Sequence, residues 1–281
     1  APDSDSGIRW FESIRGCHSK SKQHENPPRA GFCFPQDTPL VATFPPTFTP
    51  LDRLSGEVRA RGYGVVSPDD VEALSDGPLH ALAPDWDDLG PDPYLKDGGR
   101  YRRRRHACFV VDGDRIVQAP HRAHWQSLDY NALHGGMQRW FEPMRAETLA
   151  QPAWTRLLVA LGEVCSDLKG RRPWYVEAHQ FRIDASEGIG RPTPEGAHRD
   201  GVDMVAVLLV ARENVKGGET RVFSANGPAG ERFTMAEPWS MLLLDDERMI
   251  HESTPIQPLD DLGHRDTLVL TYRAGGFQGD D

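Results

Sequence analysis

From residue 174 onward, short apolar or alternating runs follow one another, separated by Gly, Pro, Asn and Asp. The first reads "WYVEAHQFRI", and seven such runs occupy residues 174–183, 204–212, 219–224, 231–235, 239–246, 248–254 and 266–274. Short strands with turn residues between them are typical of a β-sandwich or barrel. We therefore expect a mostly β core at about 174–274.

Helical spacing precedes this core in two segments, 51–82 and 141–170. The stretch "MRAETLAQPAWTRLLVALGEVCSDLKG" repeats apolar residues at intervals of three and four, and it ends at Gly170, which can cap a helix. We expect these helices to cover one face of the sheet.

Residues 1–50 are rich in Pro, Ser, charge and isolated aromatic residues. Such a composition rarely builds its own core, so we expect a partly irregular N-terminal extension. With 281 residues, 38% of them apolar, the remaining 51–281 can form a single catalytic domain.

Composition narrows the possible partners. The net charge of -10 argues against nucleic acid, and no apolar run is long enough to span a membrane. Four cysteines without a Cys-x-x-Cys pair indicate free thiols in a reducing compartment. We expect a cytoplasmic protein that acts on a small molecule; its oligomeric state does not follow from the sequence.

A basic run, "YRRRRH", lies at 101–106. Alternation places Arg103 and Arg105 on one face of a strand, and Arg102 and Arg104 on the other. Because a "VVDGD" hairpin turn follows, we interpret the run as the outer end of a hairpin strand, solvated or ion-paired at a sheet edge, in preference to an anion site.

The tripeptide His-Arg-Asp occurs twice, at 198–200 and at 264–266. His198 and Asp200 follow a strand with a spacing that directs both side chains to one face, and His251 lies on a later strand that can return beside them. Two imidazoles and one carboxylate leave three open positions on an octahedral Fe(II), the arrangement of oxygen-activating sites. His264 has no later histidine as a partner, so we assign the metal to the first tripeptide. A loop ion pair and a core histidine are the alternatives, whereas a kinase loop would need a following Asn and a Gly-rich loop.

Residues 265–273, "RDTLVLTYR", place Arg265 and Thr267 on one strand face with Arg273. A dicarboxylate cosubstrate that chelates iron needs a donor for its far carboxylate, and an arginine beside a hydroxyl supplies one. Arg265 with Thr267 is the first choice and Arg273 the second. A surface ion pair of Arg265 with Asp260 or Asp261 is the alternative.

Several segments in the same order resemble the Fe(II)/2-oxoglutarate-dependent dioxygenases, and within them the bacterial group that includes free L-isoleucine 4-hydroxylase. These segments are "VEAHQFRI", "PTPEGAHRDGVDMV", "RENVKGGET", "DDERMIHESTPI" and "RDTLVLTY", and the resemblance covers roughly 100 to 274. It implies a double-stranded β-helix core (jelly-roll, cupin-like) with flanking α-helices. It also implies Fe(II), 2-oxoglutarate and O2 as cofactors, and hydroxylation of an unactivated carbon with release of succinate and carbon dioxide.

The resemblance assigns the iron ligands to His198, Asp200 and His251 and the 2-oxoglutarate arginine to Arg265. It makes Gln180 similar to the polar residue that faces the cosubstrate. Because Asp200 retains the carboxylate that related halogenases replace, the resemblance favours hydroxylation over halogenation.

The substrate implied by the resemblance is a free L-amino acid, and the density of polar residues favours an arginine- or citrulline-like side chain. The candidate substrate residues are Arg122, Gln126, Asn131, His134, Glu177, Arg182 and Asp203. Each could instead cap a turn or pair on the surface. A non-catalytic cupin-like binding protein and an oxygenase acting on a carrier- or protein-bound residue are the alternative functions.

Overall fold

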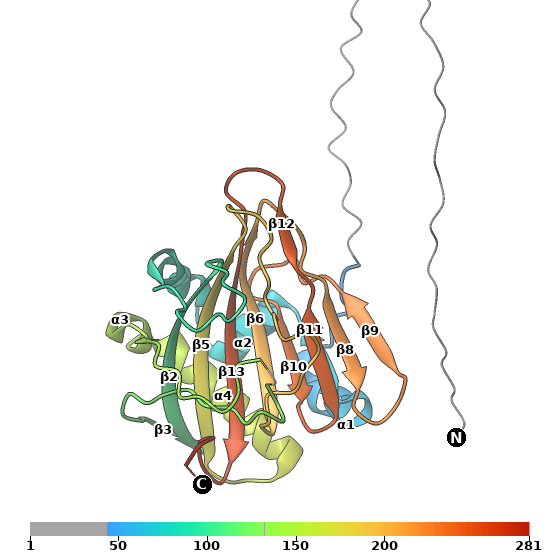
Figure 1. Cartoon of the computed structure of the whole chain (residues 1–281). Coiled ribbons are helices and arrows are strands. Elements are labelled where there is room, and N and C mark those ends of the chain that lie inside the picture. The colour runs from blue at the N-terminus through green and yellow to red at the C-terminus, as the bar shows by residue number, and fades with distance from the viewer. Residues whose placement is uncertain (1–43, 132, 281) are drawn as a thin grey trace, which may run out of the picture. The chain divides into compact units, whose positions relative to one another are not determined.

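A computed structural model describes residues 44–131 and 133–280 (Figure 1). Its largest element is an eight-stranded sheet in the order β1-β10-β6-β13-β5-β2-β3, in which β4 pairs with β2 off this path. The pairs are antiparallel except β2 with β4. Its strands are β1 (Tyr63–Val66), β2 (Arg102–Asp112), β3 (Arg115–Gln118), β4 (Glu142–Pro143), β5 (Trp174–Asp184), β6 (Met204–Glu213), β10 (Met241–Asp245) and β13 (His264–Ala274).

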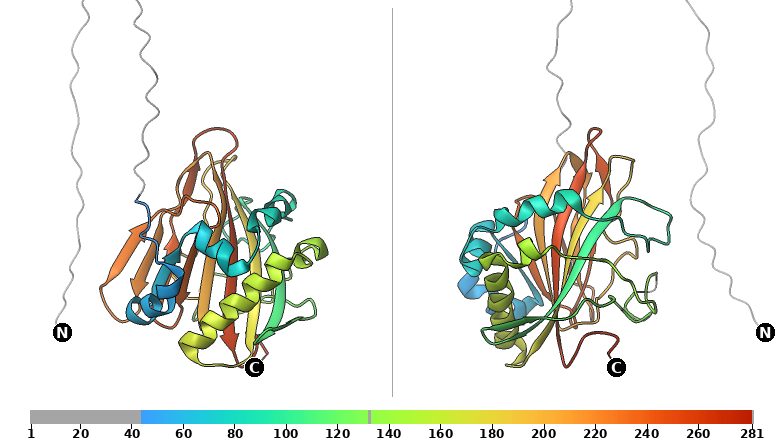
Figure 2. Two further views of the ribbon diagram at one scale, coloured as in Figure 1. Left: turned by 180° about the vertical axis from the view of Figure 1, so that it is seen from behind. Right: turned by 90° about the vertical axis from the view of Figure 1, so that its left-hand side faces the viewer.

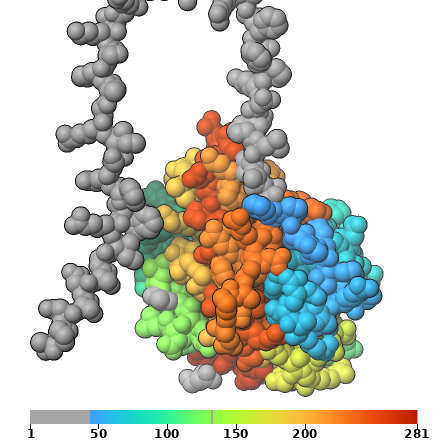
Figure 3. Space-filling model, turned by 90° about the vertical axis from the view of Figure 1, so that its right-hand side faces the viewer, coloured from blue at the N-terminus to red at the C-terminus, as the bar shows by residue number. Residues whose placement is uncertain are grey.

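Shorter strands face part of this sheet. One sheet contains β8 (Thr220–Ser224), β9 (Gly230–Phe233) and β11 (Met249–Ser253), and a two-stranded sheet contains β7 (Val215–Gly217) and β12 (Ile256–Pro258). Apolar side chains of both layers form one buried cluster, which includes Val205, Leu242, Val222, Phe233 and Met249. In Figure 3 the segment of β8 and β9 forms an orange outer face. The mostly β, jelly-roll core with flanking helices is thus confirmed.

Helices cover the opposite face of the large sheet (Figure 2). They are α1 (Leu54–Arg61), α2 (Pro68–Ser75), α3 (Ala146–Leu149) and α4 (Pro152–Lys169), with 3-10 segments η1 (Leu51–Arg53) and η2 (Leu79–Asp88). The longest, α4, begins with a proline in its first turn and ends at Gly170, whose φ is 92°. Its Leu157, Leu158 and Leu161 pack in the main core with apolar residues of β5 and β13.

The pleat of β5 and β13 separates two environments. Even-numbered residues such as Val176, Leu268 and Leu270 join the core under the helices. Odd-numbered residues face the inside of the jelly roll. There, side chains pair across the two strands as Glu177 with Thr271, His179 with Val269, Phe181 with Thr267, and Ile183 with Arg265.

Two sequence interpretations need correction. The segment 51–82 is not helical throughout, because the buried strand β1 separates α1 from α2 and pairs with β10. The predicted extension lies largely outside the described residues, but its last part lies on the domain: Thr49 N donates to Val65 O, and Phe44 O accepts from Thr234 N. In the described part of the chain, no helix is both long and apolar enough to cross a membrane.

Candidate metal centre and the adjoining pocket

The first His-Arg-Asp tripeptide and His251 lie together inside the jelly roll. His198 and His251 exchange backbone hydrogen bonds of 3.0 and 2.9 Å, so their side chains emerge side by side. Asp200 Oδ2 is 3.2 Å from His251 Nε2, and Asp200 Oδ1 is 3.9 Å from His198 Nε2. One potential ligand atom from each residue lies within 4.8 Å of the other two. The three groups can therefore share one ion.

Neighbouring groups fix these side chains. The carboxylate of Asp246 accepts hydrogen bonds from the backbone N of Asp200 and of Gly201 at 2.9 and 2.7 Å. His198 Nδ1 donates to Gly196 O at 2.9 Å, which leaves the Nε2 lone pair for a metal. Burial opposes ionisation of Asp200, but the hydrogen bond from His251 and the proximity of His198 lower its pKa. Asp200 is thus ionised and can bind a cation.

Two residues of the second tripeptide, His264 and Asp266, belong to an ion-pair network on the other side of the sheet. Asp266 accepts from Arg182 Nε at 2.9 Å and from Arg182 Nη2 at 2.7 Å, and His264 Nε2 lies 3.5 Å from the same carboxylate. Arg182 also pairs with Asp87. The prediction that Arg182 contacts substrate is therefore wrong, because an even-numbered residue of β5 faces away from the metal centre.

Arg265 lies on the inner face of β13 and is only 3% exposed. Its Nε and Nη2 have no hydrogen-bond partner within residues 44–131 and 133–280, and it forms no ion pair with Asp260 or Asp261. Burial, with the charge of Arg212, lowers the pKa of Arg265 to about 10. A buried cation without a partner is costly, so this position fits an anion that the protein does not itself supply. Thr267, also buried, shares this strand face.

The backbone around Arg265 makes room for its guanidinium group. A bulge between β13 and β6 shifts the register at Asp266 and Thr267, which places Arg212 opposite Arg265. At Gly218, where φ is 64°, a Cβ atom would lie 2.8 Å from Arg212 Nη1 and 3.6 Å from Arg265 Cδ. Glycine is therefore required there by both conformation and space.

Two other cosubstrate candidates lie elsewhere. Gln180 faces the helices and donates to Asp85 Oδ2 at 2.7 Å, so the expectation that it faces the cosubstrate is wrong. Arg273 shares the face of Arg265 but lies near the far end of β13, where its Nη1 donates to Gly276 O and Phe277 O. Arg265 is the better placed of the two arginines, because its guanidinium lacks protein acceptors.

A narrow pocket of about 80 Å³ adjoins Asp200. Four of the predicted substrate residues line it: Gln126, Asn131, His134 and Glu177. Gln126 also donates to Asp200 Oδ1 at 3.1 Å and accepts from Asn131, which ties the pocket wall to the metal centre.

The other two substrate candidates do not line this pocket. Arg122 pairs with Asp280 and lies over the ring of Phe277, and Asp203 accepts from the backbone of Ala274. Their predicted substrate roles are therefore wrong for this pocket.

Three buried arginines also line the pocket, Arg102, Arg104 and Arg139. The sequence interpretation gave no site role to Arg102 or Arg104. Arg102 pairs with Asp92 at 2.7 Å, and Arg104 lies 3.6 Å from the ring centroid of Phe141. Of the expected solvated or ion-paired edge, the ion pairing is confirmed for Arg102 and the solvation is wrong for Arg102 and Arg104, which are both buried. The alternation that put the two residues on one face is correct. The segment after β3 covers them.

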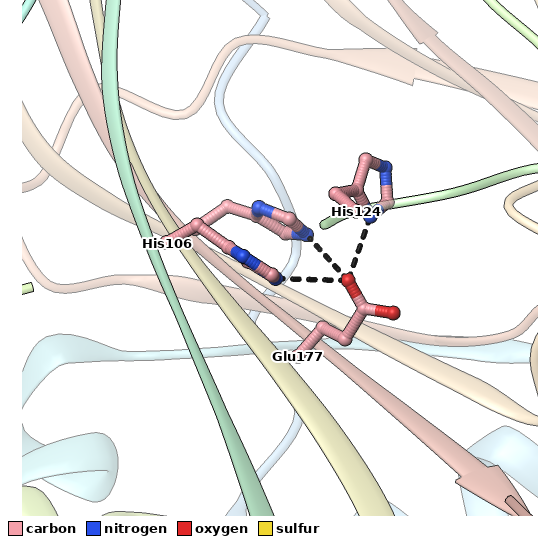
Figure 4. Close-up of side chains that lie close together, drawn as sticks. His106, His124 and Glu177 are labelled. Atoms are coloured by element: carbon pink, nitrogen blue, oxygen red, sulfur yellow. Dashed lines mark hydrogen bonds and ion pairs between the residues drawn. The ribbon is translucent and has the colours of Figure 1, made fainter. Parts of the chain in front are cut away.

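Glu177 is surrounded by three histidines (Figure 4). Its Oε2 lies 2.9 Å from His106 Nε2, 2.6 Å from His124 Nδ1 and 3.7 Å from His179 Nε2. Burial opposes ionisation of Glu177, but His124 and hydrogen bonds from His106 and His124 lower its pKa. Burial also lowers the pKa of His124 to about 4 and that of His179 well below its usual value. At neutral pH His124 and His179 are therefore neutral, and Glu177 is a carboxylate.

This cluster predicts a fall in stability at mildly acidic pH. An unfolded histidine titrates near 6.5, so between pH 6.5 and about 4 the unfolded chain binds protons that folded His124 does not. The free energy of unfolding should therefore decrease as the pH falls through this window. Thermal melts followed by circular dichroism should show that the melting temperature depends less on pH in His124→Gln than in the wild type. In His80→Gln, which changes an exposed histidine, this dependence should equal that of the wild type. An equal pH dependence in all three proteins would contradict the assigned protonation states.

Comparisons with protein families and with solved structures indicate the same family for this chain. The model of the 2OG-Fe dioxygenase family matches residues 83–271. The crystal structure of a bsmA homologue from Methylobium petroleophilum PM1 is 52% identical, with a TM-score of 0.80 over 86% of this chain and 100% of that one. IDO from Bacillus thuringiensis has 15% identity and a TM-score of 0.65 over 83% and 97% of the two chains. The Fe(II)/α-ketoglutarate-dependent dioxygenase TqaL has 20% identity and a TM-score of 0.59 over 82% and 88%. A search of curated proteins gives no match.

The chain belongs to the 2OG-Fe dioxygenase family, and it is an enzyme that uses Fe(II), 2-oxoglutarate and O2.

Proposed function

We propose that His198, Asp200 and His251 bind the Fe(II) of this dioxygenase, and that Arg265 with Thr267 binds the distal carboxylate of 2-oxoglutarate. The observation that carries the proposal is the combination of three converging ligand side chains with a buried guanidinium that has two unpaired nitrogens. When bound, iron with 2-oxoglutarate and O2 supplies the oxidant for an unactivated C–H bond, and succinate and carbon dioxide are released.

The protein's own groups position this chemistry. Asp246 orients the loop that carries Asp200 through backbone hydrogen bonds, and Gln126 donates to the Asp200 carboxylate. Arg139 and Asn131 both donate to Gln126 Oε1, so the orientation of its amide is fixed. This network keeps the ligand carboxylate in one position and links it to the pocket, in which a substrate carbon must be held close to the metal.

As substrate we propose a free L-amino acid with a polar side chain, hydroxylated on that side chain. The polar wall formed by Gln126, Asn131 and His134 beside Asp200 supports this choice. Three buried guanidinium groups line the same pocket, and they would repel an arginine side chain. Between the two side chains considered above, a neutral, citrulline-like one therefore fits better.

Two alternative functions were considered, a non-catalytic binding protein and an oxygenase that acts on a tethered residue. Membership of a dioxygenase family excludes the non-catalytic cupin-like protein. An oxygenase acting on a carrier- or protein-bound residue would need room for the attached chain. The polar and charged groups that line the pocket beside Asp200 favour a small free substrate.

The test is a substrate screen. The enzyme is incubated with Fe(II), 2-oxoglutarate, ascorbate and each free L-amino acid, and mass spectrometry looks for a product heavier by one oxygen atom. We expect such a product with at least one polar amino acid and none with His198→Ala. If only peptidyl or carrier-bound amino acids gain oxygen, the substrate proposal is wrong and the iron chemistry still stands.

A further inference from the structure

The pocket beside the metal centre contains both unpaired hydrogen-bond acceptors and unpaired cationic donors. We propose that it binds the unmodified head group of an amino acid, with Glu177 and His124 accepting from the ammonium group and Arg104 and Arg139 donating to the carboxylate. This inference rests on the function proposed above and extends it, because it specifies which chemical groups of the substrate are recognised and by which residues.

Glu177 offers one free oxygen. Its Oε2 is occupied by His106 and His124, with His179 close by, whereas its Oε1 has no hydrogen-bond partner among the described residues. Figure 4 shows Oε1 directed away from the three rings. Glu177 is 6% exposed and lines the pocket, so Oε1 is an anionic acceptor that can be reached from the pocket. An ammonium group satisfies such an acceptor, whereas an amide or hydroxyl would leave its charge unbalanced.

His124 adds a second acceptor. Because its Nδ1 donates to Glu177, the other nitrogen of the neutral ring, Nε2, carries a lone pair. That nitrogen has no hydrogen-bond partner among the described residues, and the ring lines the pocket beside Glu177. Two adjacent acceptors, one of them charged, form a subsite for a cationic donor.

The hydrogen bonds also argue against a second metal at this cluster, although its four side chains converge closely enough for one. Arg104 Nη2 lies 2.8 Å from His179 Nδ1, and arginine can only donate. The proton of neutral His179 is therefore on Nε2, the nitrogen that faces Glu177. A protonated nitrogen cannot bind a metal, and the charge of Arg104 beside the cluster disfavours a further cation.

The cationic side of the pocket has donors left over. Arg104 Nε, Arg139 Nε and Arg102 Nη2 are buried and have no partner among the described residues. Asp92 pairs with Arg102 and lies 3.7 Å from Arg104, whereas the side chain of Arg139 has, in the described part of the chain, the neutral amide of Gln126 as its acceptor. Planar guanidinium groups match a carboxylate, so the group expected here is anionic.

Opposite unpaired charges in one narrow pocket favour a zwitterion. Blocking either end of the substrate would bury a protein charge without a partner, and the attached group would also need space in the pocket. We therefore expect N-acylated amino acids, amino acid esters, and carrier-bound or peptidyl residues to be rejected.

The first test uses the wild-type enzyme with a panel of free L-amino acids, their N-acetyl derivatives and their methyl esters. Succinate release and the gain of one oxygen atom are measured for each compound at equal concentration. We expect both only with free amino acids. If a derivative is hydroxylated as well as its parent, or if no free amino acid is hydroxylated while succinate still forms, the head-group inference is overturned and the iron and 2-oxoglutarate assignment is not. The absence of succinate under all conditions would instead overturn the proposed function and, with it, this inference.

The second test compares Glu177→Gln with Glu147→Gln, a matched change at an exposed residue of α3. For the free amino acid that the panel identifies, Glu177→Gln should lower kcat/KM on the order of 100-fold. For the corresponding 2-hydroxy acid, which has no ammonium group to balance the Glu177 charge, the same change should not lower kcat/KM. Glu147→Gln should match the wild type with both compounds. An equal loss with the amino acid and the hydroxy acid would show that Glu177 has only a structural role and would overturn the inference.

A third measurement needs no turnover. The cluster should hold no metal, so metal analysis of His198→Ala after incubation with Zn²⁺ and removal of free ions should find none bound. One equivalent of zinc retained in that variant would overturn the assignment of Glu177 to the ammonium group.

Discussion

Replacing His198, Asp200 or His251 by alanine is expected to reduce succinate formation to background while the protein remains folded. Each replacement removes one of three converging ligand atoms, and each side chain lies in a loop or a short strand outside the main core. Two ligands hold a divalent ion far less tightly than three, so the loss should exceed that of any other single substitution at the site. Turnover is measured as 2-oxoglutarate-dependent succinate release, and folding by circular dichroism.

The matched control is His264→Ala. It changes the same residue type in the second tripeptide, where the side chain lies beside Asp266 on the opposite face of the sheet. We expect this variant to retain turnover. Loss of succinate formation in folded His264→Ala, with activity retained in folded His198→Ala, would reverse the assignment of the two tripeptides.

Arg265→Ala is expected to raise the apparent KM for 2-oxoglutarate about 30- to 1000-fold, which corresponds to roughly 2–4 kcal/mol for a lost charge-assisted contact. The reason is that the buried guanidinium of Arg265 has Nε and Nη2 unpaired among the described residues and can receive the distal carboxylate. Arg265→Lys should restore only part of the affinity, because an ammonium group cannot form two parallel hydrogen bonds. The measurement is succinate release as a function of 2-oxoglutarate concentration.

Arg273→Ala provides the comparison, since Arg273 lies on the same strand face but donates to backbone carbonyls of the following turn. Its apparent KM for 2-oxoglutarate should stay near that of the wild type. A steep rise with Arg273→Ala and none with Arg265→Ala would show that the strand face is correct but the residue is wrong.

The fold was predictable because strand periodicity is a local property. Alternating runs bounded by turn residues marked most of the strands between 174 and 274, and the spacing of apolar residues marked α4. The grouping of His198, Asp200 and His251 could also be predicted, since an i, i+2 pair at a strand end needs only one returning strand to complete it.

The wrong site predictions concern residues of strands, where a shift of one position moves a side chain to the other face of the sheet. Gln180 and Arg182 lie beside His179 and Phe181, but only the odd-numbered residues of β5 face the pocket. A strand with buried residues on both faces has no clear apolar alternation, so the sequence of β5 does not reveal which side is inner.

The burial of Arg102 and Arg104 and the grouping of His106 with His179 were missed for a different reason. Arg102 and Arg104 are buried because the chain segment between β3 and β4 lies over them, and this segment has little regular structure and no periodicity to predict. The pairing of His106 with His179 across β2 and β5 brings two imidazoles beside Glu177, and it depends on a register that only the folded sheet fixes.

The assignment of the iron ligands is tested by the iron content of two variants, His198→Ala and His264→Ala, which are loaded anaerobically with Fe(II) and freed of unbound metal. The central claim, that His198, Asp200 and His251 hold the iron, predicts no bound iron in folded His198→Ala and one equivalent in His264→Ala. One equivalent of iron in folded His198→Ala, with none in His264→Ala, would contradict it.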